Sequence, residues 1–166
     1  TRAGEFLLQV GEPDHEGPDS LSTTRYSQVA KVRYDPAANE VYIADGYAYI
    51  VGSEKGAGGI RILDLADPIE PVEVGSWEKT NIHDIYVKND TAYACGIGEG
   101  DLHMLDVSDK SDIKTLKVLD YDNYGTHAVW TTEDSKYIIT ADEKGGGHVK
   151  IWDAHDYDNI NLVSEY

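Results

Sequence analysis

An internal repeat is the feature that most constrains how this chain folds. Three successive segments share one pattern, in which an apolar stretch runs into an Asp-x-x-Asp turn. The turns begin at Asp64, Asp106 and Asp153, so the repeats step by 42 and 47 residues. Steps of this length are typical of β-propeller blades, in which one structural unit of four strands is used several times.

Each repeat has the side-chain pattern of β-strands. Apolar and polar residues alternate with a period of two, which indicates strands with one buried face. Short stretches rich in Gly, Asn and Asp separate these strands, and no long segment has a helical period. The clearest alternating pairs are Ile60 and Ile62, Leu102 and Met104, and Val149 and Ile151.

The pattern predicts an all-β fold, a β-propeller of about three four-stranded antiparallel blades plus one N-terminal strand. The first repeat has one strand more than the others, because 40–44 and 47–52 both have the pattern of a blade's second strand. The predicted strands are 5–10, then 29–34, 40–44, 47–52, 60–65 and 72–77, then 83–88, 92–96, 102–107 and 113–119, then 127–131, 137–141, 148–153 and 160–166.

Three blades cannot close a ring, because propellers use about 4–8 blades. An open ring leaves blade faces and strand edges uncovered. Three arrangements would cover them: a second copy that brings the total to about six blades, a longer propeller of which this is a fragment, or a different partner docked on the open end. The chain is therefore predicted to be one partial or half propeller over 1–166.

The first repeat has a further pattern around its Asp-x-x-Asp turn. An apolar pair precedes Asp64, an Asp-Pro follows at 67–68, and the run Pro-Val-Glu-Val-Gly-Ser occupies 71–76. With these residues, 59–77 and 101–119 resemble the LVIVD repeat of bacterial and archaeal surface proteins. Residues 126–134 and 145–153 are similar to the same group. The resemblance implies LVIVD-like blades over 47–79, 80–124 and 125–166, and a setting at the cell surface.

The N-terminal portion, residues 4–46, has a different pattern. The segments 4–11 and 29–46 are similar to an NHL repeat, which also implies a propeller blade. Amidating lyases of the NHL type hold zinc with channel histidines, and Gln28 stands where the first repeat would supply one.

The charge of the chain bears on its partners. It has 31 Asp and Glu against 14 Lys and Arg, a formal net charge of −17. Such a chain lacks the basic face that nucleic-acid binding needs, and it suits cations or cationic partners. No apolar run approaches the roughly 18 residues of a membrane helix. We expect no nucleic acid, no membrane insertion, a protein partner or second copy, and an extracellular or cell-surface location for a processed chain.

Two histidines open the first strand of successive repeats. His83 and His127 lie 44 residues apart, one blade, and Gln28 is the expected match in the first repeat. First strands surround the axis of a propeller, so both imidazoles should point into one channel. Imidazole is a common metal ligand, and a catalytic zinc takes about three protein ligands plus water. Packing against a neighbouring blade, metal or ligand contact, and general base chemistry all remain open for this pair.

The repeated aspartates have a structural interpretation. Asp at a strand end accepts backbone N–H bonds in Asx-turns, and this predicts turn capping. Two loops also resemble the start of a calcium loop, although the later positions that an EF-hand requires are missing. The candidate calcium ligands are Asp120, Asp122, Asp156 and Asp158.

Two functional hypotheses follow. The first is a non-enzymatic extracellular or cell-surface propeller that acts as a binding or assembly module, since no complete catalytic constellation can be recognised. The alternative is a metal-dependent propeller enzyme, a lyase or hydrolase, with His83 and His127 on its axis. No catalytic residue is assigned, and a divalent metal, Zn or Ca, is the one cofactor considered.

The repeat pattern predicts a helix content below about 10%, against the roughly 30–35% of an average globular protein. Far-ultraviolet circular dichroism measures this directly. A spectrum dominated by helix would refute the propeller interpretation.

Overall fold

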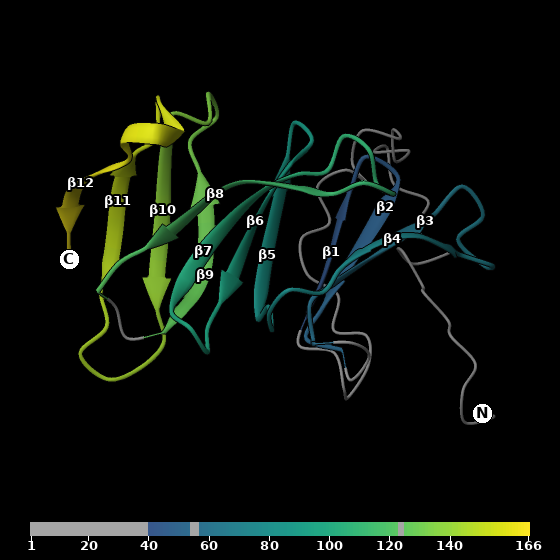
Figure 1. Cartoon of the computed structure of the whole chain (residues 1–166), viewed down its shortest axis with the longest axis horizontal. Helices are drawn as coiled ribbons and strands as arrows, with labels where there is room; N and C mark the ends of the chain where they lie inside the picture. Colours follow the sequence, from purple (N-terminus) through teal and green to yellow (C-terminus); the bar gives the residue numbers. More distant parts are fainter. Residues whose placement is uncertain (1–39, 54–56, 123–124) are drawn as a thin grey trace, which may run out of the picture.

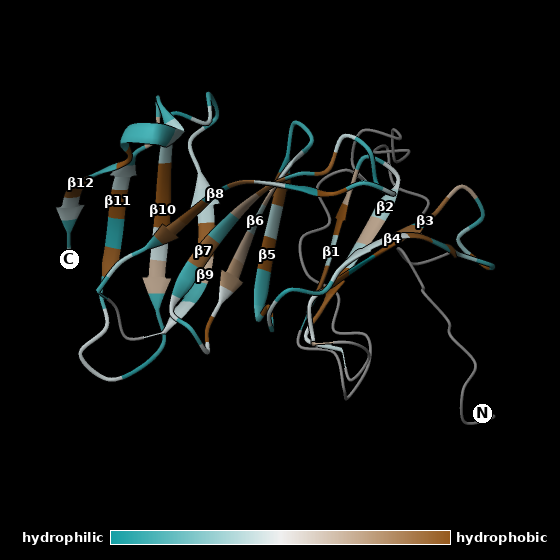
Figure 2. Ribbon diagram, viewed as in Figure 1, coloured by the Kyte–Doolittle hydropathy of each residue, from teal (hydrophilic) through white to brown (hydrophobic). Residues whose placement is uncertain are grey.

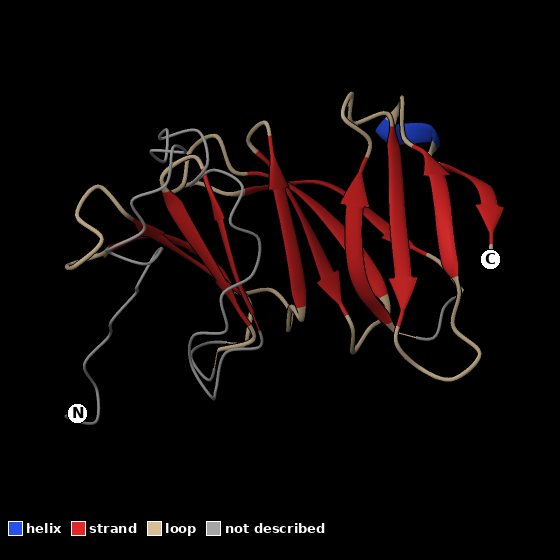
Figure 3. Cartoon of the chain, turned by 180° about the vertical axis from the view of Figure 1, so that it is seen from behind, coloured by secondary structure: helices blue, strands red, loops and turns tan. Residues whose placement is uncertain are grey.

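Three four-stranded antiparallel sheets follow one another along the chain in a row (Figure 1). The structure is a computed structural model that describes residues 40–53, 57–122 and 125–166. Of the described residues, 55% lie in strands and 2% in helix, which confirms the all-β prediction. Figure 3 shows the same row from behind, with strands in red.

Each sheet corresponds to one predicted blade, and we call them blades one, two and three. Neighbouring strands in each blade pair in chain order. Blade one holds β1 (Glu40–Ala44), β2 (Tyr47–Val51), β3 (Ile60–Asp64) and β4 (Val72–Trp77). Blade two holds β5 (Asp84–Lys88), β6 (Thr91–Gly96), β7 (Asp101–Asp106) and β8 (Lys114–Asp120). Blade three holds β9 (Thr126–Thr131), β10 (Tyr137–Asp142), β11 (Val149–Asp153), the short 3-10 helix η1 (Tyr157–Asn159) and β12 (Asn161–Glu165).

The strand β1 corrects one expectation from the sequence. Residues 40–44 are not a surplus second strand but the first strand of blade one, paired with β2. Asp45 and Gly46 join the two strands with φ angles of 50° and 83°, the signature of a two-residue hairpin turn with both residues left-handed. Asn89 and Asp90 make the same turn between β5 and β6.

The hairpin also changes which residue matches His83. His83 lies directly before β5, and β1 begins at the position equivalent to the start of β5. The residue that matches His83 in the first repeat is therefore Asn39 and not Gln28. Both of these residues lie outside the described part of the chain. So do the predicted strands 5–10 and 29–34, and with them most of the NHL-like portion.

Blade-to-blade packing forms the main core. One face of each blade carries rows of large side chains that the sheet register places side by side across the strands. In blade one such a row consists of Tyr42, Tyr49 and Ile62, which are 8%, 1% and 0% exposed. These residues belong to the same buried cluster as the facing side chains of blade two, among them Ile85, Val87, Ala94 and Leu105.

The repeated aspartates cap turns, as the sequence predicts. In all three blades the carboxylate at the end of the third strand accepts a backbone N–H from two residues later, and the Asp three residues on does the same. The six bonds span 2.7–3.1 Å. Hydrogen bonds from Ser108 hold the pKa of Asp106 below its usual value, and those from Ser111 do so for Asp109.

Trp152 anchors blade three against blade two. Its side chain is 6% exposed, and its indole N–H donates to Thr140 Oγ1 over 3.0 Å. The ring also packs against Tyr121, with 4.8 Å between the centroids. In the described part of the chain, no helix is long and apolar enough to span a bilayer.

Replacing Trp152 with Ala should reduce the free energy of unfolding by about 3–5 kcal/mol, because it leaves a cavity where a large aromatic was buried. Urea unfolding of both proteins measures the difference. The matched control is Trp130→Ala, measured at low protein concentration, since Trp130 is 50% exposed in the single chain and its loss should cost distinctly less there. Equal losses at the two positions would contradict this assignment of the buried face.

Alkaline pH should destabilise the fold through its buried tyrosines. Burial, with a smaller contribution from Tyr86, raises the pKa of Tyr42 to about 12, whereas an exposed tyrosine has a pKa of about 10. A raised pKa in the folded state means that the stabilisation is complete below pH 10 and is lost as the pH rises toward about 12.

Urea unfolding at a series of alkaline pH values tests this, with Tyr42→Phe as the matched variant. The variant should lose less stability than the parent over the same pH range. If both proteins lose equal stability, Tyr42 does not carry the effect.

Candidate functional site

The first strands of the three blades lie next to one another and bring their ends together (Figure 1). Strand β5 contacts β1 on one side and β9 on the other. Since these strands occupy equivalent positions in their blades, residues that match in the repeat are neighbours in space. A group with two histidines lies at one end of these strands, and a cavity lined by aromatic rings lies at the other.

The structure brings together the two histidines that the sequence singled out. His83 lies one residue before β5, and His127 is the second residue of β9. Their rings are 4.7 Å apart between centroids and tilted by 42°. The backbone N–H of His83 donates to the carbonyl of Cys95 over 2.8 Å, which ties this position to blade two.

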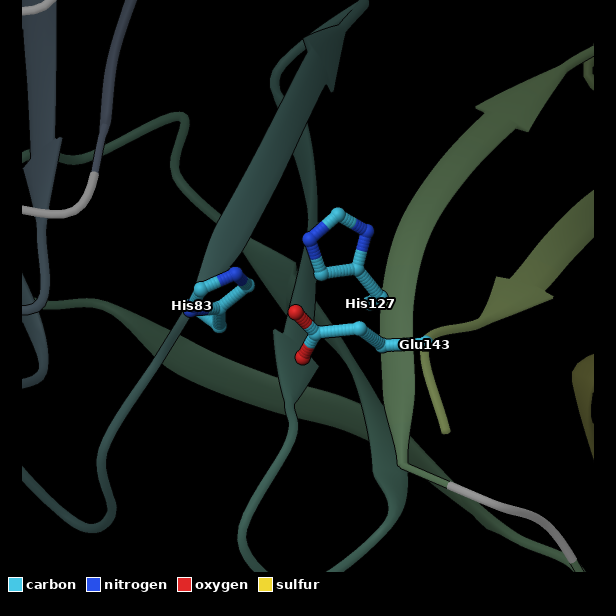
Figure 4. A group of neighbouring side chains, drawn as sticks. All are labelled: His83, His127 and Glu143. Carbon is cyan, nitrogen blue, oxygen red and sulfur yellow. The ribbon is translucent and has the colours of Figure 1, made fainter. Parts of the chain in front are cut away.

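The carboxylate of Glu143, which the sequence analysis did not predict, lies beside the two histidines. Glu143 follows β10 directly, and Figure 4 shows its carboxylate directed toward the two imidazoles. One side-chain ligand atom from each of the three residues lies within 4.8 Å of the others. The Glu143 backbone N–H donates to the Gly125 carbonyl over 3.0 Å, which fixes its distance from the start of β9.

A β-bulge explains how this group forms. Ala141 pairs with Ala128, whereas the next residue, Asp142, pairs with Thr126. His127 is therefore the extra residue of β9, with no partner across the ladder. A bulge locally changes where a side chain points and often lies next to functional sites. The pairing of β9 with β10 can be predicted from sequence, but the bulge that brings Glu143 beside His127 cannot.

The neighbouring carboxylate, Asp142, is already engaged. Lys150 Nζ lies 2.8 Å from Asp142 Oδ2, and this lysine side chain is only 5% exposed. The Tyr121 hydroxyl also donates to Asp142 Oδ1 over 3.2 Å. Asp142 thus serves as a buried structural ion pair, and Glu143, which is exposed, is the carboxylate that faces the histidines.

A second acidic group with a histidine lies on blade two. The ligand atoms of Glu99, Asp101 and His103 also lie within 4.8 Å of one another. His103 Nε2 is 3.0 Å from Asp101 Oδ2, and its ring packs against Trp77 at 5.0 Å. Burial raises the pKa of Asp101. Asp101 and His103 are buried and Glu99 is exposed, and the contact of His103 with Trp77 places this group beside the packing of blade two on blade one.

The predicted calcium ligands occupy other places. Asp156 caps η1 by accepting the N–H of Asp158 over 2.9 Å, and it also accepts a bond from Asn159. Asp120 ends β8 and Asp122 follows it on the surface. None of the four belongs to either three-ligand group found among the described residues.

The opposite ends of the first strands line a cavity of about 750 Å³. Its wall includes Tyr42, Tyr86 and Trp130, which stand at equivalent positions of the three blades. Their rings follow one another, at 5.6 Å from Tyr42 to Tyr86 and 4.2 Å from Tyr86 to Trp130. This row of rings runs from the buried interior to the half-exposed Trp130.

A known family model matches the sequence of the first two blades. The model of a family described as LVIVD repeat matches residues 37–79 and 81–118. The two matched segments coincide with blades one and two, and the first of them includes β1. Blade three lies outside the matched segments, and the NHL resemblance of residues 4–46 remains a prediction.

A solved structure supports the fold. The chain is similar to the N-terminal domain of Nup159, a β-propeller, with a TM-score of 0.50 and 16% identity over 81% of this chain. The match covers 32% of that chain, so this chain spans about a third of its length. At this identity the likeness shows the fold alone. No curated protein matches the chain in sequence.

Proposed function

We propose that this chain is a non-enzymatic propeller module whose function is assembly through the outer face of blade three. The observation that supports it is an apolar blade face that repeats the pattern of the two buried faces before it. The comparison is between residues of blade two and the matching residues of blade three, which occupy the same places in their sheets.

Equivalent residues differ in exposure along the row of blades. In blade two the row of Tyr86, Tyr93 and Met104 is 7%, 1% and 0% exposed, because blade three covers it. In blade three the matching row is Trp130, Ile139 and Ile151. Trp130 is 50% exposed there, and the other two are half-buried.

A second row repeats the comparison. Cys95, Leu102 and Leu119 of blade two are 0%, 0% and 8% exposed. The matching residues of blade three are Ala141 and Val149, and Val149 is 42% exposed. Figure 2 shows the hydrophobic residues of β10 and β11 at this end of the row. The face has the composition of a blade interface without a blade against it.

We assign a second copy of this chain as the occupant. Within the chain, the matching face of blade one is covered by small and aliphatic residues of blade two such as Ile85, Val87 and Ala94, so the face of blade three calls for an apolar surface of the same kind. Two chains of net charge −17 repel each other, so apolar contact has to supply the association. Added salt should screen the repulsion and tighten the assembly.

The setting that we propose is extracellular or at the cell surface. The LVIVD repeats support it, because the sequence pattern resembles that of surface proteins. The strongly acidic composition is compatible with it, since a large net charge keeps a protein soluble.

Sedimentation equilibrium of the tag-free chain tests the assembly. We expect a mass above that of the 18.3 kDa chain at micromolar concentration, approaching that of a dimer as salt is added. Val149→Lys should shift the protein toward the single chain, because it places a charge in the apolar contact.

Leu116→Lys is the matched control. Leu116 lies on β8 of blade two, is 47% exposed, and the substitution changes the net charge by the same amount. It should leave the mass unchanged. A folded single chain under all conditions would overturn the proposal, and so would equal effects of the two variants.

The second candidate function is a metal-dependent propeller enzyme, a lyase or hydrolase. The observation that favours it is the approach of His83 and His127 at one end of the first strands. Turnover that depends on added metal and is lost in His127→Ala would support it over the assembly module.

A further inference from the structure

We propose that His83, His127 and Glu143 form a binding site for a divalent transition metal ion, with zinc as the ion that fits best. This inference does not depend on assembly through blade three, because all three ligands belong to one chain. Figure 4 shows the two imidazoles and the carboxylate directed toward a common space.

The donor set selects the class of metal. Two imidazole nitrogens and one carboxylate oxygen are the ligands of many catalytic zinc sites, whereas calcium and magnesium prefer oxygen ligands. Glu143 supplies the third protein ligand that the histidine pair lacked in the sequence. Three protein ligands leave one tetrahedral position for water or another small molecule.

The distances are within reach of coordination. The three ligand atoms lie within 4.8 Å of one another. Ligands around a tetrahedral zinc ion with bonds of about 2.1 Å lie about 3.4 Å apart, so modest side-chain rotations would close the site. Backbone hydrogen bonds from His83 to Cys95 and from Glu143 to Gly125 hold the main chain in place while the side chains move.

The location gives the ion access and a structural consequence. His83 and His127 are half-buried and Glu143 is exposed, so the ion can enter from solvent. His83 precedes blade two, whereas His127 and Glu143 belong to blade three. A bound ion would therefore link two blades, and it should stabilise the folded chain by mass action.

Titration of the tag-free protein with Co²⁺, followed by visible absorption, tests the site. We expect one equivalent to bind, with the intense bands of a low-coordinate cobalt centre, and Zn²⁺ to displace it. His127→Ala should weaken binding by more than the roughly 10–100-fold typical of losing a residue that only supports a ligand. Glu143→Gln should also weaken it and should change the cobalt spectrum.

Two controls keep the test specific. His155→Ala removes an exposed imidazole that pairs with Asp153, and Glu133→Gln removes an exposed carboxylate that lines the cavity at the other end of the first strands. Both should bind Co²⁺ as the parent does. Glu143→Gln changes only a surface side chain, so it stays informative if His127→Ala fails to fold.

Three results would overturn the site: absence of cobalt binding, binding that survives His127→Ala and Glu143→Gln in folded protein, or equal losses in the two controls. The absorption titration reports the metal site and sedimentation reports assembly, so either proposal can fail alone.

Discussion

The packing of one blade face on the next is the interaction on which the rest of the structure depends. Each four-stranded sheet buries rows of large side chains, such as Tyr49 with Ile62 and Tyr93 with Met104, only when another sheet lies against it. Solenoid-like stacking of this kind makes stability a sum of interfaces between neighbours. It also fixes the neighbourhood of the first strands, and so brings His83 next to His127 although one whole blade of sequence separates them.

The same packing leaves the outer face of blade three both apolar and exposed. A face that is buried twice within the chain is repeated a third time, with Trp130 and Val149 in the open. At the other end of the row, Val41, Ile43, Ala48 and Ile50 form a buried cluster of their own. The two ends of the row thus differ, and the described structure presents its apolar blade face at blade three.

Much of the fold could be predicted from the sequence because it rests on local patterns. The Asp-x-x-Asp turns and the period-two strands identify three blades, and all six turn carboxylates accept the expected bonds. The role of 40–44 was misjudged, since its pairing depends on left-handed φ at Asp45-Gly46 rather than on hydrophobic pattern. His83 and His127 could be paired from their spacing. Glu143 could not, because a one-residue bulge decides which side chain faces them.

Quenching of tryptophan fluorescence by acrylamide tests most directly whether another copy covers the face of blade three. Trp77 and Trp152 are 4% and 6% exposed, whereas Trp130 is 50% exposed, so the quenchable emission comes from Trp130. If a second copy packs on this face, quenching should decrease as protein concentration rises, and Val149→Lys should restore it. Quenching that stays constant from the lowest to the highest concentration would contradict the assembly and leave blade three open to solvent.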